Sequence, residues 1–203
     1  HYLSQSSPSK KEFNFMKVYF AGGENKSWLK AINEADGNKS LYSYYYLAKG
    51  GSDFIDNSAV RQNDIFLDSG GFSAWSKGVD VKIDDYIEFI KRNKNNITTY
   101  ANLDVIGDAE KTNENQLYME SKGLKPIPTF HYGTDYNILK EMIKKYKYIA
   151  LGGLVPISRN KNKMIKHLDN CFKIIKDKVK VHGFGVTNML LLKRYPFYSV
   201  DST

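Results

Sequence analysis

Eight short apolar or aromatic runs alternate with helical patterns along this chain, and that alternation restricts the fold more than any other feature. Strands separated by helix-length segments are typical of parallel βα units rather than of an antiparallel sandwich. The runs are Met16 to Phe20, Tyr42 to Leu47, Asp64 to Asp68, Thr99 to Asp104, Pro126 to His131, Tyr148 to Gly152, Lys180 to Phe184 and Phe197 to Asp201. The sequence therefore predicts an α/β fold, a single (β/α)8 TIM barrel.

Apolar stripes at helical spacing predict three of the connecting helices. The stripes are Ile83, Tyr86, Ile87 and Ile90; Ile138, Leu139, Met142, Ile143 and Tyr146; and Met164, Ile165, Leu168, Phe172 and Ile175. The second run fits least well, because its tyrosine cluster can equally pack as an irregular loop. No helix follows the eighth run, so we expect a barrel without its last helix, unless the natural chain continues or a partner covers that face.

Length and composition favour one intracellular domain. The chain has 203 residues, of which 41% are hydrophobic, and we expect residues 13–203 to form the barrel after a polar leader over residues 1–12. A single cysteine, Cys171, excludes an intramolecular disulfide framework and a cysteine-rich zinc site. Neither a membrane span of ~20 apolar residues nor an apolar signal segment is present, which predicts a cytoplasmic protein without a membrane partner.

The net charge of +8 makes a polyanion a plausible partner, because lysine and arginine neutralise phosphates. Lysine-rich helices can also be ordinary solvated surfaces, so the charge alone decides nothing.

Carboxylates stand at the ends of several predicted strands. Asp68, Asp104 and Asp201 each follow an apolar run. In a barrel the carboxyl ends of the strands and the loops after them form the active site. Carboxylates gathered at a buried rim are costly unless they are paired or functional, so these aspartates are candidate catalytic residues.

Each of these residues also has a structural interpretation. Asp68 can be a turn former, and Asp104 can cap the helix that begins near Asp108. His131 and His182 can be hydrogen-bonded core histidines. The occurrence of three strand-terminating aspartates together favours catalysis.

The segment Asp68-Ser69-Gly70-Gly71-Phe72 resembles the DSGGFQ signature of tRNA-guanine transglycosylases, with Ser73 in place of the usual glutamine. Further matches follow in the family's order. They are an aspartate after the next strand, Gly-Gly-Leu after the sixth, a Gly-Val turn after the seventh and an aspartate that ends the eighth. The likeness covers Ile65 to Thr203.

The resemblance implies a pentosyltransferase that exchanges guanine for a 7-deazaguanine derivative. Asp201 would be the nucleophile that attacks C1′ of the target nucleoside and forms a covalent intermediate. Asp68 would move the proton on the base. This division of work agrees with carboxylate chemistry at an anomeric carbon.

The resemblance also implies a base-binding set. Asp104 would recognise the Watson–Crick edge of guanine, since a carboxylate accepts from two adjacent donors. The other implied residues are His131, which stands where the family often has an amide side chain, and the backbone of Gly152, Gly153 and Leu154. Because the target base must leave its stack to be attacked, we also expect the rings of Phe72 and Tyr132 to stack on it. Lys193 and Arg194, near the end of the barrel, are expected phosphate contacts.

The zinc subdomain of typical family members has no counterpart here, and we expect neither a metal nor a cofactor. The chain is closer to reduced, phage-type or DNA-acting relatives. The expected partners are a nucleic acid, with DNA favoured over tRNA, and a free 7-deazaguanine base. A homodimer or a partner subunit is also compatible with the sequence.

Three other functions compete with base exchange. A barrel glycoside or nucleoside hydrolase would also use paired carboxylates. A metal-dependent hydrolase could use His131 and His182, although no HxH or HExxH spacing occurs. A non-catalytic nucleic-acid-binding barrel would depend on lysine-rich helices such as Lys140 to Lys147 and Lys161 to Lys166.

Overall fold

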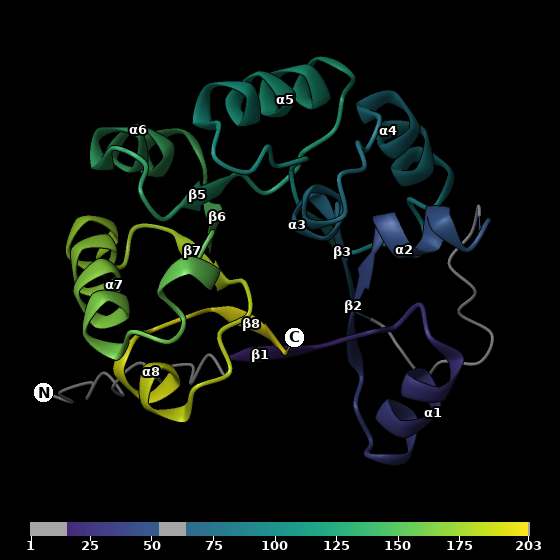
Figure 1. Cartoon of the computed structure of the whole chain (residues 1–203), viewed down its shortest axis with the longest axis horizontal. Coiled ribbons are helices and arrows are strands. Elements are labelled where there is room, and N and C mark those ends of the chain that lie inside the picture. The colour runs from purple at the N-terminus through teal and green to yellow at the C-terminus, as the bar shows by residue number, and fades with distance from the viewer. Residues whose placement is uncertain (1–15, 53–63, 203) are drawn as a thin grey trace, which may run out of the picture.

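The computed structural model describes residues 16–52 and 64–202 of the chain as parallel strands with helices around them (Figure 1). The predicted leader lies outside the described residues. The strands are β1 (Lys17–Ala21), β2 (Lys39–Ser43), β3 (Asp64–Asp68), β4 (Thr99–Tyr100), β5 (Thr129–His131), β6 (Tyr148–Gly152), β7 (Lys180–Gly183) and β8 (Ser199–Ser202). The helices are α1 (Lys26–Glu34), α2 (Tyr44–Lys49), α3 (Gly71–Ser76), α4 (Ile83–Arg92), α5 (Ala109–Ser121), α6 (Tyr136–Lys145), the 3-10 turn η1 (Val155–Ile157), α7 (Lys161–Ile175) and α8 (Met189–Arg194).

The sheet curls into a near-barrel. Its strand order is β4-β3-β2-β1-β8-β7-β6-β5, and all the paired strands are parallel. The two ends of this order meet at an isolated parallel bridge between Ala101 and Ile127. There the Ile127 N–H donates to the Tyr100 carbonyl at 2.9 Å, and the Asn102 N–H donates to the Ile127 carbonyl at 3.0 Å. The predicted TIM-barrel-like fold is confirmed.

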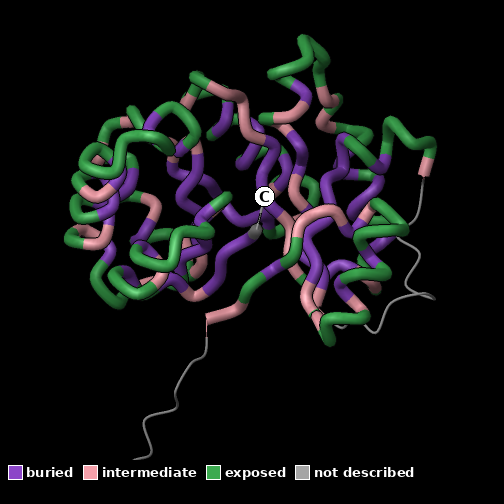
Figure 2. The backbone as a smooth tube through the Cα atoms, turned by 60° about the horizontal axis from the view of Figure 1, so that its bottom comes forward, coloured by how far each residue is buried: buried purple, intermediate pink, exposed green. Residues whose placement is uncertain are grey.

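One hydrophobic cluster fills the inside of the barrel and two others lie between the strands and the helices. The inner cluster consists of Tyr19, Leu41, Phe66, Ala101, Ile127 and Ala150. In Figure 2 the buried segments of the tube gather toward the inside of the molecule and most exposed segments lie at its outside, although the strand β1 also has exposed residues, Val18 and Phe20. Side chains alternate between the two faces of a strand. Asp68 therefore shares the inner face with Phe66, two residues before it.

The rim at the amino ends of the strands, opposite to Asp68, holds a network of hydrogen bonds around one carboxylate. Asp64, at the start of β3, accepts from Lys17 Nζ at 2.7 Å, from the Tyr19 hydroxyl at 2.8 Å and from the Thr98 hydroxyl at 2.7 Å. Burial raises the pKa of Asp64, but these hydrogen bonds and the lysine charge outweigh burial, and the pKa lies below its ordinary value. This rim satisfies its carboxylate completely, as expected of the stabilising end of a barrel.

The second strand differs from the prediction. The run Tyr42 to Leu47 was expected to be a strand, but β2 ends at Ser43 and α2 begins at Tyr44. The Tyr44 ring packs 5.1 Å from that of Tyr86 and 5.2 Å from that of Phe89, both on α4. Tyr44 is therefore buried by packing between helices, which a short apolar run cannot distinguish from burial in a strand.

The other predictions on secondary structure hold with small shifts of boundary. The three apolar stripes lie on α4, α6 and α7. The fourth run contributes only Thr99–Tyr100 to the ladder, and the fifth only Thr129–His131. Asp108 caps α5 by accepting the Lys111 N–H at 2.8 Å, so the capping role considered for Asp104 is wrong. Within residues 16–52 and 64–202, no helix is long and apolar enough to cross a membrane.

Candidate active site

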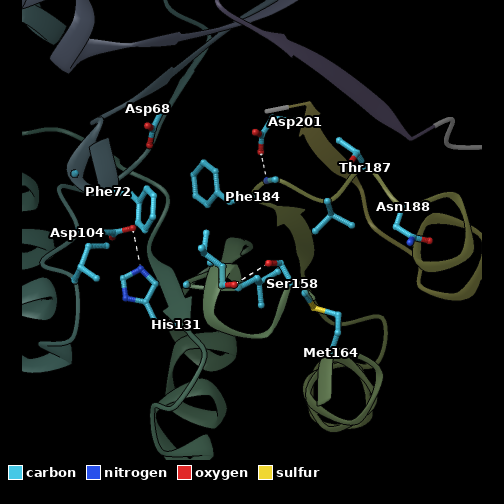
Figure 3. Close-up of a pocket in the computed structure, with 18 of the residues that line it drawn as sticks. Asp68, Phe72, Asp104, His131, Ser158, Met164, Phe184, Thr187, Asn188 and Asp201 are labelled. Carbon is cyan, nitrogen blue, oxygen red and sulfur yellow. Dashed lines mark hydrogen bonds and ion pairs between the residues drawn. The ribbon is translucent and has the colours of Figure 1, made fainter. Parts of the chain in front are cut away.

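A cavity of about 800 Å³ opens at the carboxyl ends of the strands. Its volume lies within the range of about 300–1,000 Å³ that is common for small-molecule sites. Figure 3 shows the side chains of Asp68, Asp104 and Asp201 gathered at this cavity. The predicted site residues that line it are Asp68, Phe72, Asp104, His131, Gly152, Gly153, Leu154 and Asp201.

The Asp-Ser-Gly-Gly segment forms a tight turn from β3 into α3. Gly70 has a φ of 73°, and a Cβ there would lie 2.4 Å from Tyr45 Cβ. A Cβ on Gly71 would lie 2.7 Å from the backbone oxygen of Asp104. Glycine is required at Gly70 because φ is positive and the start of α2 lies against it, and at Gly71 because the turn packs directly against the loop after β4. The turn thereby brings Asp68 and Asp104 to the same wall.

Asp68 holds a proton far more tightly than an ordinary aspartate. Burial raises its pKa, the negative charges of Asp104 and Asp201 raise it further, and the hydrogen bond from the Gly70 N–H at 3.0 Å opposes them. The resulting pKa is about 7. One oxygen of Asp68, Oδ2, accepts the Gly70 N–H and so helps to form the turn, as the structural interpretation predicted. The same side chain also lines the cavity. A carboxyl group that titrates near neutral pH is suited to acid and base catalysis.

We expect Asp68→Asn to stabilise the protein above neutral pH. The folded state protonates Asp68 with a pKa of about 7, above the ordinary value of 3.8. The wild type therefore loses stability as the pH rises from about 4 to about 7, and the variant escapes this loss. The side chain is partly exposed to the cavity, so we expect a modest gain in melting temperature of about 3 to 6 °C at pH 8 and none near pH 4.

Melting curves at several pH values check this expectation, with Asp64→Asn as the matched control. Asp64 has a lowered pKa, so its charge stabilises the fold above about pH 4 and its loss should lower the melting temperature. Equal behaviour of the two variants would show that Asp68 carries no electrostatic strain.

Asp104 and His131 form a pair on the cavity wall. His131 Nε2 lies 3.0 Å from Asp104 Oδ2, and both side chains are largely buried, with 12% and 14% exposed. Burial lowers the pKa of His131, but the hydrogen bond to Asp104 and its charge raise that pKa above the ordinary value. Asp104 Oδ1 is buried without a hydrogen-bond partner among the described residues. An unsatisfied buried carboxylate oxygen at a cavity is suited to a donor on a ligand.

The Gly-Gly-Leu segment follows β6 and lies against His131. Gly152 pairs in register with His131, and its carbonyl accepts the Tyr132 N–H at 3.1 Å. A Cβ on Gly152 would lie 2.7 Å from Thr129 Cγ2 and 3.2 Å from His131 Cδ2. The backbone of this segment can therefore approach the cavity closely.

Asp201 is buried inside the end of the barrel, with 1% of its surface exposed. Its Oδ1 accepts the Gly185 N–H at 2.9 Å, from the turn after β7. His182 Nε2 lies 3.2 Å from the same oxygen, without the alignment of a hydrogen bond. The carboxylate is held in place by backbone and also lines the cavity.

Three predicted site residues lie apart from the cavity lining. Tyr132 is 38% exposed, and its ring packs edge-on against His167. Lys193 and Arg194 end α8, whereas the cavity is lined by residues at the start of that helix. Arg194 forms an ion pair with Asp169 at 3.1 Å. These positions give no support to a role in stacking or phosphate binding at the cavity.

Several residues that line the cavity had no predicted role at the site. They are Ser158, Lys161, Phe184, Thr187 and Asn188. Thr187 and Asn188 follow the seventh strand, so their position at the end of a strand could have identified them. Lys161 begins α7 in a run of lysines, and nothing in the sequence separates it from its neighbours.

No group of three or more histidine, cysteine, aspartate or glutamate residues is arranged to hold a metal ion within the part of the chain that the structure describes. Comparison of the sequence with models of protein families found no match. Comparison with curated proteins also found none.

Proposed function

We propose that this protein exchanges guanine for a 7-deazaguanine base in a nucleic acid through a covalent intermediate on Asp201. One observation carries the proposal. Asp68, whose pKa is about 7, lines the same cavity as Asp201, whose carboxylate is fixed by the Gly185 N–H. A proton carrier and a separate, oriented carboxylate are the two groups needed for double displacement at an anomeric carbon.

In the first step, an Asp201 carboxylate oxygen attacks C1′ of the target nucleotide. The C1′–N9 bond breaks, its electron pair leaves with guanine, and protonated Asp68 gives its proton to the departing base. The negative charges of the surrounding carboxylates stabilise the oxocarbenium character that develops at C1′. The products are free guanine, a glycosyl ester on Asp201 and ionised Asp68.

In the second step, ionised Asp68 removes the proton from N9 of the incoming base. That nitrogen attacks C1′, and the ester bond to Asp201 breaks. Asp201 is released as a carboxylate and Asp68 is protonated again. Two inversions at C1′ give net retention, and the enzyme ends in the state in which it began.

Asp104 is the residue that we assign to recognition of guanine. Its buried Oδ1 has no partner among the described residues, and its Oδ2 is oriented by His131. Guanine offers two adjacent donors, N1–H and the exocyclic amine, which match a carboxylate. His131 stands where related enzymes are expected to have an amide, and here it fixes the rotation of Asp104.

Binding of a flipped nucleotide is consistent with the shape of the cavity. Phe72 lines it and is 44% exposed, so its ring is available to stack on a base. Lys161 supplies a cation at the same cavity. DNA is the polymer that we propose first, with tRNA as the alternative.

Incorporation of radiolabelled guanine tests the proposed reaction. In separate reactions, wild-type protein and labelled guanine are incubated with single-stranded DNA, double-stranded DNA or tRNA. The label in each polymer is then measured. We expect label in one polymer class, DNA first. Release of guanine without incorporation would indicate a hydrolase, and binding without either would indicate a non-catalytic barrel.

We expect Asp104→Asn to lose the preference for guanine over adenine. An amide presents one donor to the base edge, so one of the two matched hydrogen bonds becomes a clash of donors. Loss of a hydrogen bond to a charged group corresponds to roughly a 10- to 100-fold fall in kcat/KM for guanine. Competition between labelled guanine and unlabelled adenine measures the effect, and unchanged discrimination would exclude Asp104 from recognition.

A further inference from the structure

A buried chain of polar side chains leads away from Asp201 through the inside of the barrel. His182 Nε2 lies 3.2 Å from Asp201 Oδ1, and His182 Nδ1 lies 2.7 Å from the Ser199 hydroxyl. That hydroxyl is 2.6 Å from the hydroxyl of Tyr148. His182 and Ser199 are 0% exposed, and Tyr148 at the start of β6 is half-buried. The catalytic steps proposed above use none of these three residues.

We propose that His182 is a positioning residue that holds the Asp201 carboxylate in line for attack, with its ring held from the other side by the hydrogen bond between Nδ1 and Ser199. This inference rests on the proposed function, because it assigns His182 a part in the same reaction. His182 touches neither substrate nor the reacting atoms and acts through Asp201.

The carboxylate of Asp201 sets the direction of the hydrogen bonds along this series of polar side chains. An ionised carboxylate only accepts, so a hydrogen bond between Asp201 and His182 requires the proton on Nε2. In the structure Nε2 lies 3.2 Å from Asp201 Oδ1 without the alignment of that bond, and the proposal is that the bond forms with the proton on Nε2. In the neutral ring Nδ1 is then an acceptor, and the Ser199 hydroxyl must donate to it. Tyr148 in turn donates to Ser199 Oγ. Burial raises the pKa of the Tyr148 phenol, which keeps that donor protonated.

The surroundings of His182 argue for this role. Its ring lies 4.5 Å from that of Phe66, 4.6 Å from that of Phe184 and 6.3 Å from that of Tyr19. A purely structural side chain in such an aromatic pocket would be served as well by an apolar residue. A buried imidazole is favourable there only if both nitrogens have partners. Nε2 has no aligned partner among the described residues, and Asp201 Oδ1, 3.2 Å away, can become its acceptor when the geometry tightens on substrate binding.

The first test reads the tautomer of His182 by nitrogen-15 NMR of the imidazole rings, without any substrate. We expect a single Nε2–H tautomer in the wild type, with a proton resonance at low field that moves to high field in Asp201→Ala. Ser199→Ala leaves Asp201 beside Nε2, so the Nε2–H tautomer should persist in that variant. His167→Gln, which changes a buried histidine on α7, is the control and should leave the His182 signals unchanged. An Nδ1–H tautomer, or no response to Asp201→Ala, would overturn the proposal.

The second test measures guanine exchange in two replacements of the same residue. His182→Leu fills the aromatic pocket but has no donor, and we expect kcat to fall about 100-fold with KM unchanged. His182→Gln keeps an N–H near the position of Nε2 and should recover at least about tenfold of the loss. A structural role predicts the reverse order, with leucine the better replacement.

The two tests separate the two proposals. No exchange by the wild type, together with the Nε2–H tautomer and its response to Asp201→Ala, would reject the proposed function and retain the coupling of His182 to Asp201. Exchange by the wild type with full activity in His182→Leu would retain the function and reject the role of His182.

Discussion

Asp201→Ala is expected to abolish base exchange, with a fall in kcat of at least about 10⁴-fold. The substitution removes the only protein atom that forms a bond to C1′ in the proposed mechanism. Nucleic-acid binding should survive, because the recognition group Asp104 and the cavity wall at Phe72 are unchanged. Labelled guanine exchange gives the rate, and a filter-binding assay with the same polymer gives the affinity.

Two variants make this experiment specific. Asp201→Asn retains an oxygen that can accept the Gly185 N–H, so it should fold normally and still be inactive. Asp169→Ala removes a carboxylate that pairs with Arg194 on the outer helices, and it should keep full activity. Exchange that persists in Asp201→Asn would remove Asp201 from the mechanism.

Asp68→Asn should slow exchange by about 10²- to 10⁴-fold and should change the pH profile. The carboxyl group, with a pKa of about 7, is protonated below neutral pH and can then give its proton to the departing base. In the wild type, kcat/KM should therefore fall as the pH rises above about 7, by tenfold for each pH unit. The amide cannot transfer a proton, so this fall should disappear in the variant.

His131 is the appropriate control for that profile, because its pKa is also raised. His131→Gln should keep the fall above pH 7 while weakening binding of guanine. If the fall disappeared in His131→Gln and persisted in Asp68→Asn, the proton carrier would be His131.

The positions of the three aspartates were predictable from sequence, and their interactions were not. Asp68 and Asp201 end strands, and strand ends meet at one rim of any parallel barrel. The contact between Asp104 and His131, by contrast, depends on two side-chain rotamers in residues 27 apart along the chain. The pKa of Asp68 depends on burial and on the charges of Asp104 and Asp201, which are distant from it in the sequence. Sequence patterns predict neither the contact between Asp104 and His131 nor the pKa of Asp68.

Sequence patterns indicate burial and charge but do not identify the contacts that a side chain makes. A short apolar run indicates that its residues are buried but does not identify the element that covers them. The tyrosines of α2 were therefore assigned to a strand. Lys193 and Arg194, which were expected to contact phosphates, lie at the end of α8 apart from the cavity lining, and Arg194 pairs with Asp169. His182 was considered a core histidine, which is correct for its burial but misses its contact with Asp201.

The most direct test of the central claim is to identify the residue that becomes attached to the nucleic acid. Wild-type protein is incubated with the polymer that incorporates guanine, denatured, and digested with protease and nuclease, and the linked peptide is sequenced by mass spectrometry. We predict a nucleotide without its base, joined through C1′ to the side chain of Asp201. A link to another residue, or turnover with no covalent species under conditions that trap an ester, would contradict the account.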